Sequence, residues 1–181
     1  MTDEILTAFP DQFDVIREAT KQAGFTMPSD AKTGALLIML AGTKPAGKML
    51  ELGTGTGLSA AWILAGMDQD AKLVSVDNDP GVLNIAKQYL NDHRLSLVLQ
   101  DGEAWIEANR SLKFDFIFAD TWHGKYLMLA DVLDMLLPGG IYIVDDMLPQ
   151  ENWPEGHQEK AKNFIEVLEA RKDLTLIKQC W

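Results

Sequence analysis

Short apolar runs alternate with helical patterns along the middle of this chain of 181 residues. The runs are rich in β-branched and aromatic residues, as strands are. They are "KMLEL", "KLVSVD", "LSLVLQD", "KFDFIFAD" and "GIYIVDD", in this order from Lys48 to Asp146. Helical segments separate them, and a strand, helix, strand connection places consecutive strands parallel to each other. We therefore expect an α/β fold of the doubly wound type, in which a mostly parallel sheet carries helices on both faces.

Apolar residues three or four positions apart predict the helices. Two helices precede the first strand, in "DQFDVIREATKQAG" and "AKTGALLIMLAG". Those between and after the strands are "GLSAAWILAG", "GVLNIAKQYL", "EAWIEANR", "KYLMLADVLDMLL" and "AKNFIEVLEARKD". Asp79 and Pro80 suit the cap and first turn of the helix that they introduce.

The length of the chain and its 47% hydrophobic residues allow one sizeable core. We expect a single domain over residues 1–181. Within it, residues 1–47 should supply covering helices and residues 48–148 the ligand-binding core. Residues 149–181 should supply a loop on the side of the second substrate, a helix and a last strand, "LTLIKQCW".

Charge and hydropathy limit the partners that we expect. The net charge of -11 would repel phosphate backbones, so nucleic acid is not an expected substrate. No apolar stretch approaches the roughly 20 residues that span a bilayer, and the acidic start "MTDEILTAF" lacks the basic region of a signal peptide. One cysteine, Cys180, excludes an internal disulfide framework. We expect a cytoplasmic protein that does not enter a membrane.

The strongest ligand-binding signal is "ELGTGTGLS", in which three glycines follow a strand and open a helix. Gly53, Gly55 and Gly57 let a ligand approach the backbone closely and meet free amides. The dinucleotide fingerprint needs its third glycine one position later, where Leu58 stands. Glu51 beside the glycines would repel a pyrophosphate but attract an ammonium group. Both features argue against a nicotinamide cofactor.

Two further acids end the next two strands. Asp77 ends "KLVSVD" about twenty residues after the glycines, the spacing at which an acid binds the two hydroxyls of a ribose. Asp101, in "LQDGEAW", ends the following strand, where an acceptor could hold the exocyclic amine of a base. Capping of the next helix is the alternative role for Asp101.

These sites occur together in an order that resembles one family. Glu51 with "GTGTG", then Asp77, "QDG", "FADTW" and "IVDDM" resemble the class I S-adenosylmethionine-dependent methyltransferases. Within that class they resemble the cation-dependent O-methyltransferases, which include the catechol and caffeoyl-CoA enzymes. The resemblance covers residues 27–148 and implies a Rossmann-like fold.

The resemblance assigns the parts of S-adenosylmethionine to residues of this chain. Those near the methionine part and the glycine loop are Glu51, Gly53, Thr54, Gly55 and Ser59. Those near the ribose and the adenine are Asp77, Asn78, Asp101 and Gly102. The segment "MPSDAKTG" resembles the part of the family that closes over the cofactor from the N-terminal side.

Three carboxylates are expected at one edge of the sheet, because Asp120 ends one strand and Asp145 and Asp146 end the next. An all-oxygen ligand set suits a divalent cation such as Mg, Ca or Mn. The family uses two Asp and one Asn at these positions, and Asp146 stands where the Asn is expected. Loop acids that only cap and solvate are the alternative.

The resemblance also implies the reaction, which is methylation of a hydroxyl on a small phenolic or catechol-like molecule. A metal would gather two neighbouring hydroxyl oxygens and lower the pKa of one. In the catechol enzymes a lysine that directly follows a tryptophan takes the proton; here that position is His123, with Lys125 two residues on. The alternatives are a nicotinamide-dependent oxidoreductase and a protein that binds S-adenosylmethionine without turnover.

The resembled fold normally ends with two strands, the last antiparallel and inserted beside the strand "GIYIV". This sequence offers only "LTLIKQCW". Unpaired amides beside "GIYIV" would cost free energy in a buried setting. We therefore expect self-association, such as a homodimer, or a truncated chain, rather than a monomer in which "LTLIKQCW" pairs directly with "GIYIV".

Overall fold

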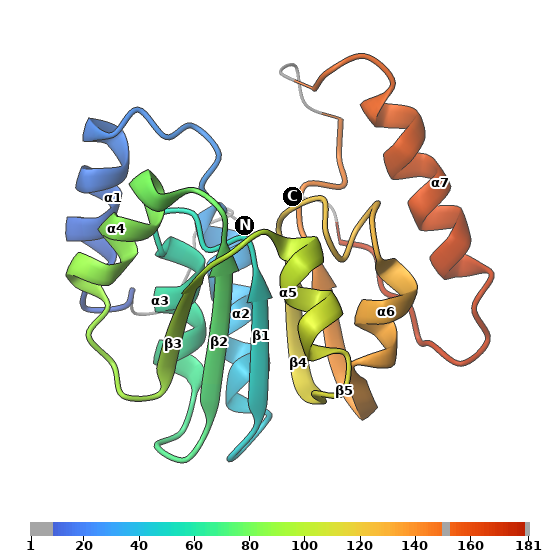
Figure 1. The fold of residues 1–181 in the computed structure, drawn as a ribbon, viewed down its shortest axis with the longest axis horizontal. Coiled ribbons are helices and arrows are strands. Elements are labelled where there is room, and N and C mark those ends of the chain that lie inside the picture. Colours follow the sequence, from blue (N-terminus) through green and yellow to red (C-terminus); the bar gives the residue numbers. More distant parts are fainter. Residues whose placement is uncertain (1–8, 150–152, 180–181) are drawn as a thin grey trace, which may run out of the picture.

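The computed structural model describes residues 9–149 and 153–179, so Cys180 lies outside the described residues. Five strands form one sheet in the order β3-β2-β1-β4-β5, and every neighbouring pair is parallel (Figure 1). The strands are β1 Lys48–Leu52, β2 Lys72–Asp77, β3 Leu95–Leu99, β4 Phe114–Ala119 and β5 Leu136–Val144. The predicted parallel α/β sheet is confirmed. The strand order reverses between β1 and β4. Open sheets of this kind bind ligands in the crevice that forms at such a reversal, beyond the carboxyl ends of the strands.

Helices cover both faces of the sheet (Figure 1). They are α1 Phe13–Gln22, α2 Ala31–Gly42, α3 Leu58–Gly66, α4 Pro80–Tyr89, α5 Gly102–Asn109, α6 Leu129–Asp134 and α7 His157–Glu169. Helices α1 to α4 pack with Met49 and Phe116 in one core, while α5 and α6 pack with Leu50 and Ile117 in the other. The side chains of a strand alternate between faces, so neighbouring residues enter different cores. None of the described helices is both long and apolar enough to cross a bilayer.

Aspartates begin three of these helices at the edge where the strands end. Asp30 accepts a hydrogen bond from Thr33 N, at 2.7 Å, and so caps α2. Asp79 caps α4 and Asp101 caps α5 in the same way. A short side chain that accepts from the free amides of the first turn stabilises a helix start by about 1 kcal/mol. The caps thereby fix where the loops between strand and helix turn.

Two predicted elements were wrong. The helix expected over "KYLMLADVLDMLL" is limited to α6, and β5 already begins at Leu136, which pairs with Phe114. The described part of "LTLIKQCW", residues 174–179, forms no strand. It has no ladder partner there, and Ile177 is 75% exposed. Apolar and β-branched residues favour a strand, but a strand persists only where its backbone groups are paired.

Candidate functional site

The glycine loop between β1 and α3 has a backbone that few other residues could adopt. Gly53, Gly55 and Gly57 have φ angles of 103°, 52° and 95°. A Cβ at Gly53 would lie 2.8 Å from Asp120 O, and one at Gly57 would lie 2.9 Å from Ala86 Cβ. The loop therefore needs glycine both for its left-handed conformation and for its close approach to β4 and α4.

Asp77 holds this loop against the end of β2. Its carboxylate accepts hydrogen bonds from Gly55 N at 2.8 Å and from Asp79 N at 2.9 Å. The side chain thus joins the glycine loop to the start of α4, and it also faces a pocket. Its predicted role in binding a ribose stays a prediction.

A small pocket of about 60 Å³ lies at the ends of β1 and β2. The residues that line it include Gly53, Asp77, Asn78, Gln100, Gly102 and His123. Four of them had been predicted to bind the cofactor, so the fold brings these residues together. Sites for drug-sized ligands measure about 300 to 1,000 Å³, so this pocket can enclose only part of a nucleoside-containing cofactor.

Glu51 lies below the glycine loop, with no exposed surface. Its Oε2 accepts a short hydrogen bond from Ser75 Oγ, and Ser75 Oγ also pairs with Thr54 Oγ1 at 2.6 Å. Burial raises the pKa of Glu51 to about 8, while the hydroxyls of Ser59 and Ser75 act in the opposite direction. Ser59 and Thr54, both predicted near the methionine part of the cofactor, are themselves buried.

The second carboxylate oxygen of Glu51, Oε1, is buried and has no hydrogen-bond partner among residues 9–149 and 153–179. Buried polar atoms are nearly always paired in native proteins, so an unpaired one beside a ligand loop suits a donor on a ligand. The ammonium group of S-adenosylmethionine is such a donor. The free oxygen, the glycine backbone and the pocket therefore fit this cofactor, although the predicted contact between Glu51 and the ammonium remains a prediction.

Gly102 lines the pocket at the start of α5, and Asp101, which is not among the lining residues, directly precedes it. Asp101 Oδ1 accepts a hydrogen bond from Ala104 N at 3.1 Å, so the capping role that was the alternative reading is present. A Cβ at Gly102 would lie 2.7 Å from His123 Nδ1. His123, predicted as a base, therefore packs directly against a residue predicted to flank the adenine.

The predicted acids converge at the ends of β4 and β5. Ala119 pairs with Val144, and Asp120 and Asp145 directly follow these two residues. Burial raises the pKa of Asp120 to about 7, Lys125 lowers it, and Asp145 and Asp146 raise it further. Burial also raises the pKa of Asp145. Asp146 is exposed and has a φ of 57°, a conformation that Asn and Asp tolerate better than most side chains.

Three donors contact these acids, and the sequence patterns indicated neither Ser29 nor Thr33 among them. Ser29 Oγ donates to Asp120 Oδ2 at 3.1 Å, and Thr33 Oγ1 donates to Asp145 Oδ1 at 3.4 Å. Lys125 Nζ lies 3.4 Å from Asp120 Oδ1. Ser29 and Thr33 belong to the segment "MPSDAKTG", whose resemblance to a covering segment was the only signal that could have found them.

The acids do not form a metal cage as they are arranged. Their oxygens are the ligand type that Mg²⁺ and Ca²⁺ prefer. However, both oxygens of Asp120 already have donors, one of them an ammonium that would repel a metal ion. Across residues 9–149 and 153–179 there is no group of three or more His, Cys, Asp or Glu side chains placed to hold a metal. The predicted divalent cation therefore does not fit this arrangement.

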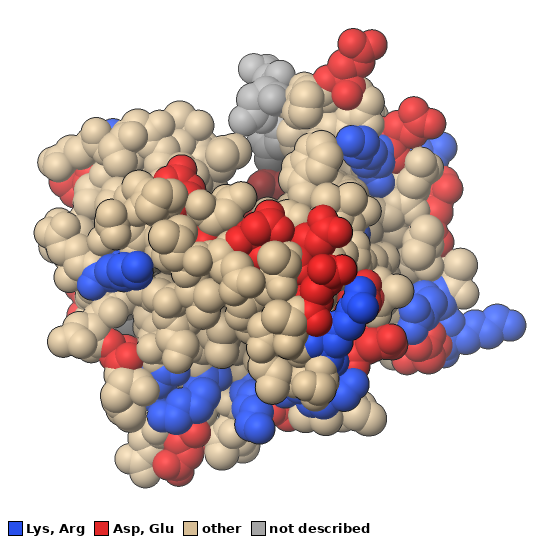
Figure 2. Space-filling model, in the orientation of Figure 1, with Lys and Arg blue, Asp and Glu red and all other residues tan. Residues whose placement is uncertain are grey.

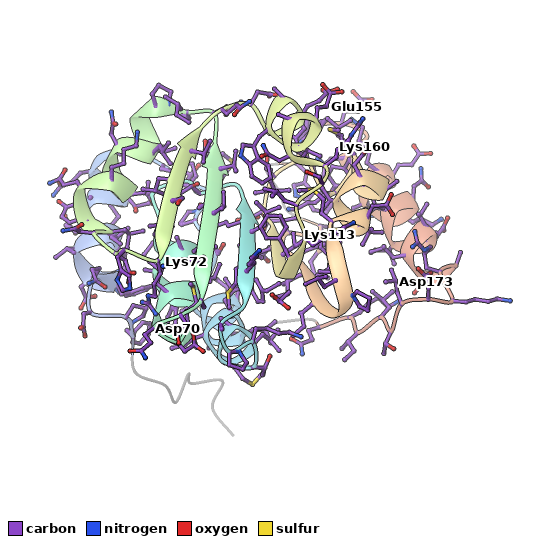
Figure 3. All side chains as sticks on the ribbon, turned by 60° about the horizontal axis from the view of Figure 1, so that its bottom comes forward. Asp70, Lys72, Lys113, Glu155, Lys160 and Asp173 are labelled. Atoms are coloured by element: carbon purple, nitrogen blue, oxygen red, sulfur yellow. The ribbon has the colours of Figure 1, made fainter. Side chains whose placement is uncertain are left out.

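Aromatic side chains from the loop after β4 and from α7 gather beside the acids. The ring of Trp122, which is 43% exposed, lies under Lys160 Nζ at 4.3 Å. Tyr126 Oη and His157 Nε2 form a hydrogen bond of 3.1 Å. The centres of the Trp153 and His157 rings are 4.4 Å apart. Figure 3 shows Lys160 at the opposite side of the molecule from Lys72, which begins β2. These rings form an aromatic wall between the loop after β4 and the start of α7.

Charge is divided between the two ends of the sheet. Five aspartates follow or end strands at the carboxyl edge, namely Asp77, Asp101, Asp120, Asp145 and Asp146. Basic side chains gather along the lower edge of the face in Figure 2, and Lys72 and Lys113 lie where strands begin. An anionic edge attracts cationic ligands, and the sulfonium cofactor is cationic.

A parallel sheet with a glycine loop after β1 and an acid at the end of β2 defines the class of Rossmann-like, nucleotide-binding folds. A family model described as O-methyltransferase matches residues 9–179. The chain belongs to this O-methyltransferase family.

Relatives and solved structures agree with this assignment. Over 128 residues, 67% of this chain and 55% of the relative, the chain is 30% identical to a candidate O-methyltransferase of Mycolicibacterium vanbaalenii. It spans 48% to 64% of the length of three such curated relatives. The structure of the O-methyltransferase TomG from Streptomyces achromogenes, involved in tomaymycin synthesis and bound to S-adenosylmethionine, matches with a TM-score of 0.78. The identity is 19%, over 93% of this chain and 82% of that one, a likeness that concerns the fold.

Proposed function

We propose that this chain is an S-adenosylmethionine-dependent methyltransferase that methylates a hydroxyl of a small molecule, such as a phenol or a catechol. The observation that carries the proposal is the glycine loop held by Asp77 at a pocket shared with Asn78 and Gly102. Membership of the O-methyltransferase family supports the same activity.

The residues around the pocket have separate proposed roles in cofactor binding. Asp77 is proposed to hold the ribose hydroxyls, with Asn78 beside it, while Asp101 and Gly102 flank the adenine. Gly53 and Gly55 leave room for the methionine part, and Thr54 and Ser59 support the loop from below. When bound, S-adenosylmethionine would supply an electrophilic methyl group on a positively charged sulfur.

An acceptor hydroxyl must lose its proton as its oxygen takes the methyl group. His123 is the proposed proton acceptor, because a neutral imidazole serves as a base near pH 7 and His123 lines the pocket. Lys125, the other predicted candidate, has its Nζ 3.4 Å from Asp120 Oδ1, and it is not among the residues that line the pocket. The aromatic wall around Trp122 suits a planar acceptor.

Calorimetry on the full chain tests the cofactor. We expect S-adenosylmethionine to bind and Asp77→Ala to weaken binding by on the order of 1.5 to 3 kcal/mol, the value of hydrogen bonds to a charged group. Asp70→Ala is the matched control and should change nothing, since Asp70 is exposed and lies near Lys72 at the start of β2 (Figure 3), whereas the pocket lies at the end of that strand. Equal affinity of the Asp77→Ala variant would remove Asp77 from the site.

A methyl-transfer screen tests the reaction. Catechols, phenolic acids and thiols are offered with S-adenosylmethionine, with and without Mg²⁺. Transfer to a hydroxyl supports the proposal. Binding of a nicotinamide cofactor in place of S-adenosylmethionine would instead indicate an oxidoreductase, and binding of S-adenosylmethionine without transfer to any acceptor would indicate a binding protein.

A further inference from the structure

Lys125 is a buried lysine beside the acids at the ends of β4 and β5. Its side chain is 5% exposed, and its Nζ lies 3.4 Å from Asp120 Oδ1. Lysines are almost never fully buried unless an anion compensates for the lost hydration. We propose that the Lys125 ammonium takes the place of the divalent cation that the family resemblance implies. The consequence for catalysis rests on the proposed function; the electrostatic arrangement does not.

The acids around Lys125 need a positive charge. Asp120 is 13% exposed at its side chain, and Asp145 follows the neighbouring strand end. Carboxylates this close repel each other, and removing them from water adds a further cost. Lys125 places its charge among them, since its Nζ lies 3.4 Å from Asp120 Oδ1 at the paired ends of β4 and β5. One ammonium therefore offsets the repulsion within the cluster.

The remaining donors bond to Asp120 and to one carboxylate oxygen of Asp145. Asp120 accepts from Ser29 with its Oδ2 and from Lys125 with its Oδ1. Asp145 Oδ1 accepts from Asp146 N at 2.9 Å and from Thr33 Oγ1 at 3.4 Å. A Mg²⁺ ion would need these oxygens at about 2.0 to 2.1 Å in an octahedral arrangement. It would have to displace Ser29 and Thr33 and overcome the charge of Lys125.

The loop that carries Lys125 fixes it in this position. The amides of Lys125, Tyr126 and Leu127 all donate to Trp122 O, at 3.0 to 3.2 Å. Gly124 has a φ of 88°, and a Cβ there would lie 3.0 Å from Leu52 Cδ1. The tight turn therefore packs on β1 through a glycine and turns the next side chain, that of Lys125, into the interior. The hydrogen bonds of the turn and the packing of Gly124 therefore fix the position of Lys125.

An ammonium and a divalent cation require different numbers of hydroxyl groups on the acceptor. A chelating metal gathers two neighbouring oxygens, which selects molecules with vicinal hydroxyls. A single fixed positive charge acts on a nearby oxyanion without chelation, and it acts strongly where water is excluded. We infer that the acceptor of this chain needs only one hydroxyl.

Binding of Mn²⁺ to the full chain tests the inference without reference to methyl transfer. Free Mn²⁺ is measured by electron paramagnetic resonance during a titration of the wild type, of Lys125→Met, and of Lys162→Met. Methionine keeps the length of the side chain and removes its charge. Lys162 is a control because its side chain is 74% exposed on α7. The Lys125→Met variant should have a Mn²⁺ site that binds at least roughly 10-fold more tightly than any site of the wild type, because a nearby positive charge has been removed.

The outcomes separate clearly. Gain of a Mn²⁺ site in Lys125→Met, absent from the wild type and from Lys162→Met and lost again when Asp120→Asn is added, supports the inference. A wild-type site that Asp120→Asn abolishes would overturn it, as would a folded Lys125→Met variant that gains no site. If Lys125→Met does not fold, the titrations of the wild type and of Asp120→Asn decide the question. Absence of a Mn²⁺ site that depends on Asp120 in the wild type then supports the inference, and presence of such a site overturns it. Lack of transferase activity would affect none of these results.

Discussion

At the scale of single residues, Glu51 is the group whose ionisation most affects the fold. It is fully buried, and its pKa is raised to about 8 from an ordinary 4.5. The unfolded chain therefore loses the proton at a lower pH than the folded chain. Its contribution to stability is complete below about pH 4.5 and is lost as the pH rises toward 8. Asp120, with a pKa of about 7, acts in the same direction.

Glu51→Gln should remove most of this dependence. A neutral amide of the same shape has no proton to lose, so the variant should be more stable than the wild type at pH 7 by on the order of 3 kcal/mol. Near pH 4 the two should be equally stable. Urea unfolding between pH 4 and pH 8 measures the difference, and Glu103→Gln, an exposed change on α5, serves as the control. A wild type whose stability does not fall over this range would show that Glu51 titrates normally.

At the scale of elements, helix α1 is tied to the glycine loop by a buried pair of hydroxyls. Thr20 Oγ1 lies 2.7 Å from Thr56 Oγ1 and also donates to Ile16 O at 2.7 Å. The ring of Phe25, just beyond α1, packs close to Gly55, because a Cβ on Gly55 would lie only 3.3 Å from it, tighter than an ordinary van der Waals contact. The N-terminal helices therefore do more than cover the sheet, since they support the loop that is proposed to bind the cofactor.

Thr20→Val should test this support. Valine has the shape of threonine without its hydroxyl, so Thr56 would lose its partner in the interior. We expect a loss of about 1 to 3 kcal/mol in unfolding free energy and weaker binding of S-adenosylmethionine. Thr43→Val is the control, because Thr43 is exposed and bonds only within the end of α2. Equal stability of Thr20→Val and Thr43→Val would contradict the proposed support.

The strands and most helices could be predicted, because their signals are local. Apolar alternation in "KFDFIFAD" and the cap at Asp79 act over a few residues, and the structure contains both elements. The contacts of Ser29 and Lys125 could not be predicted, since they depend on how loops from distant elements meet at one edge. The end of the helix before β5 was also missed. There the pairing of Leu136 with Phe114 outweighs the helical preference of the residues around it.

At the scale of the whole molecule, β5 has one edge without a strand partner in the described part of the chain. Exposed strand edges pair readily with other strands. We expect self-association, measured as a concentration-dependent mass by light scattering. Those amides of residues 140–144 that face the unpaired edge, away from β4, should then be protected from hydrogen exchange only at concentrations where the assembly forms. The amides of β1, which is paired on both sides, should be protected at all concentrations. A monomer with fully protected amides at 140–144 would contradict this expectation.

The hydrogen bonds between the N-terminal segment and the acids also bear on how the chain reaches its folded state. Ser29 meets Asp120 across 91 residues, and Thr33 meets Asp145 across 112. Closing loops of this size costs entropy that earlier contacts must offset, so such pairs form after the strands between them. During synthesis, the glycine loop and Asp77 can come together as soon as β1 and β2 have left the ribosome. The acid cluster must wait for β5, so the half of the site assigned to the acceptor is the last to be assembled.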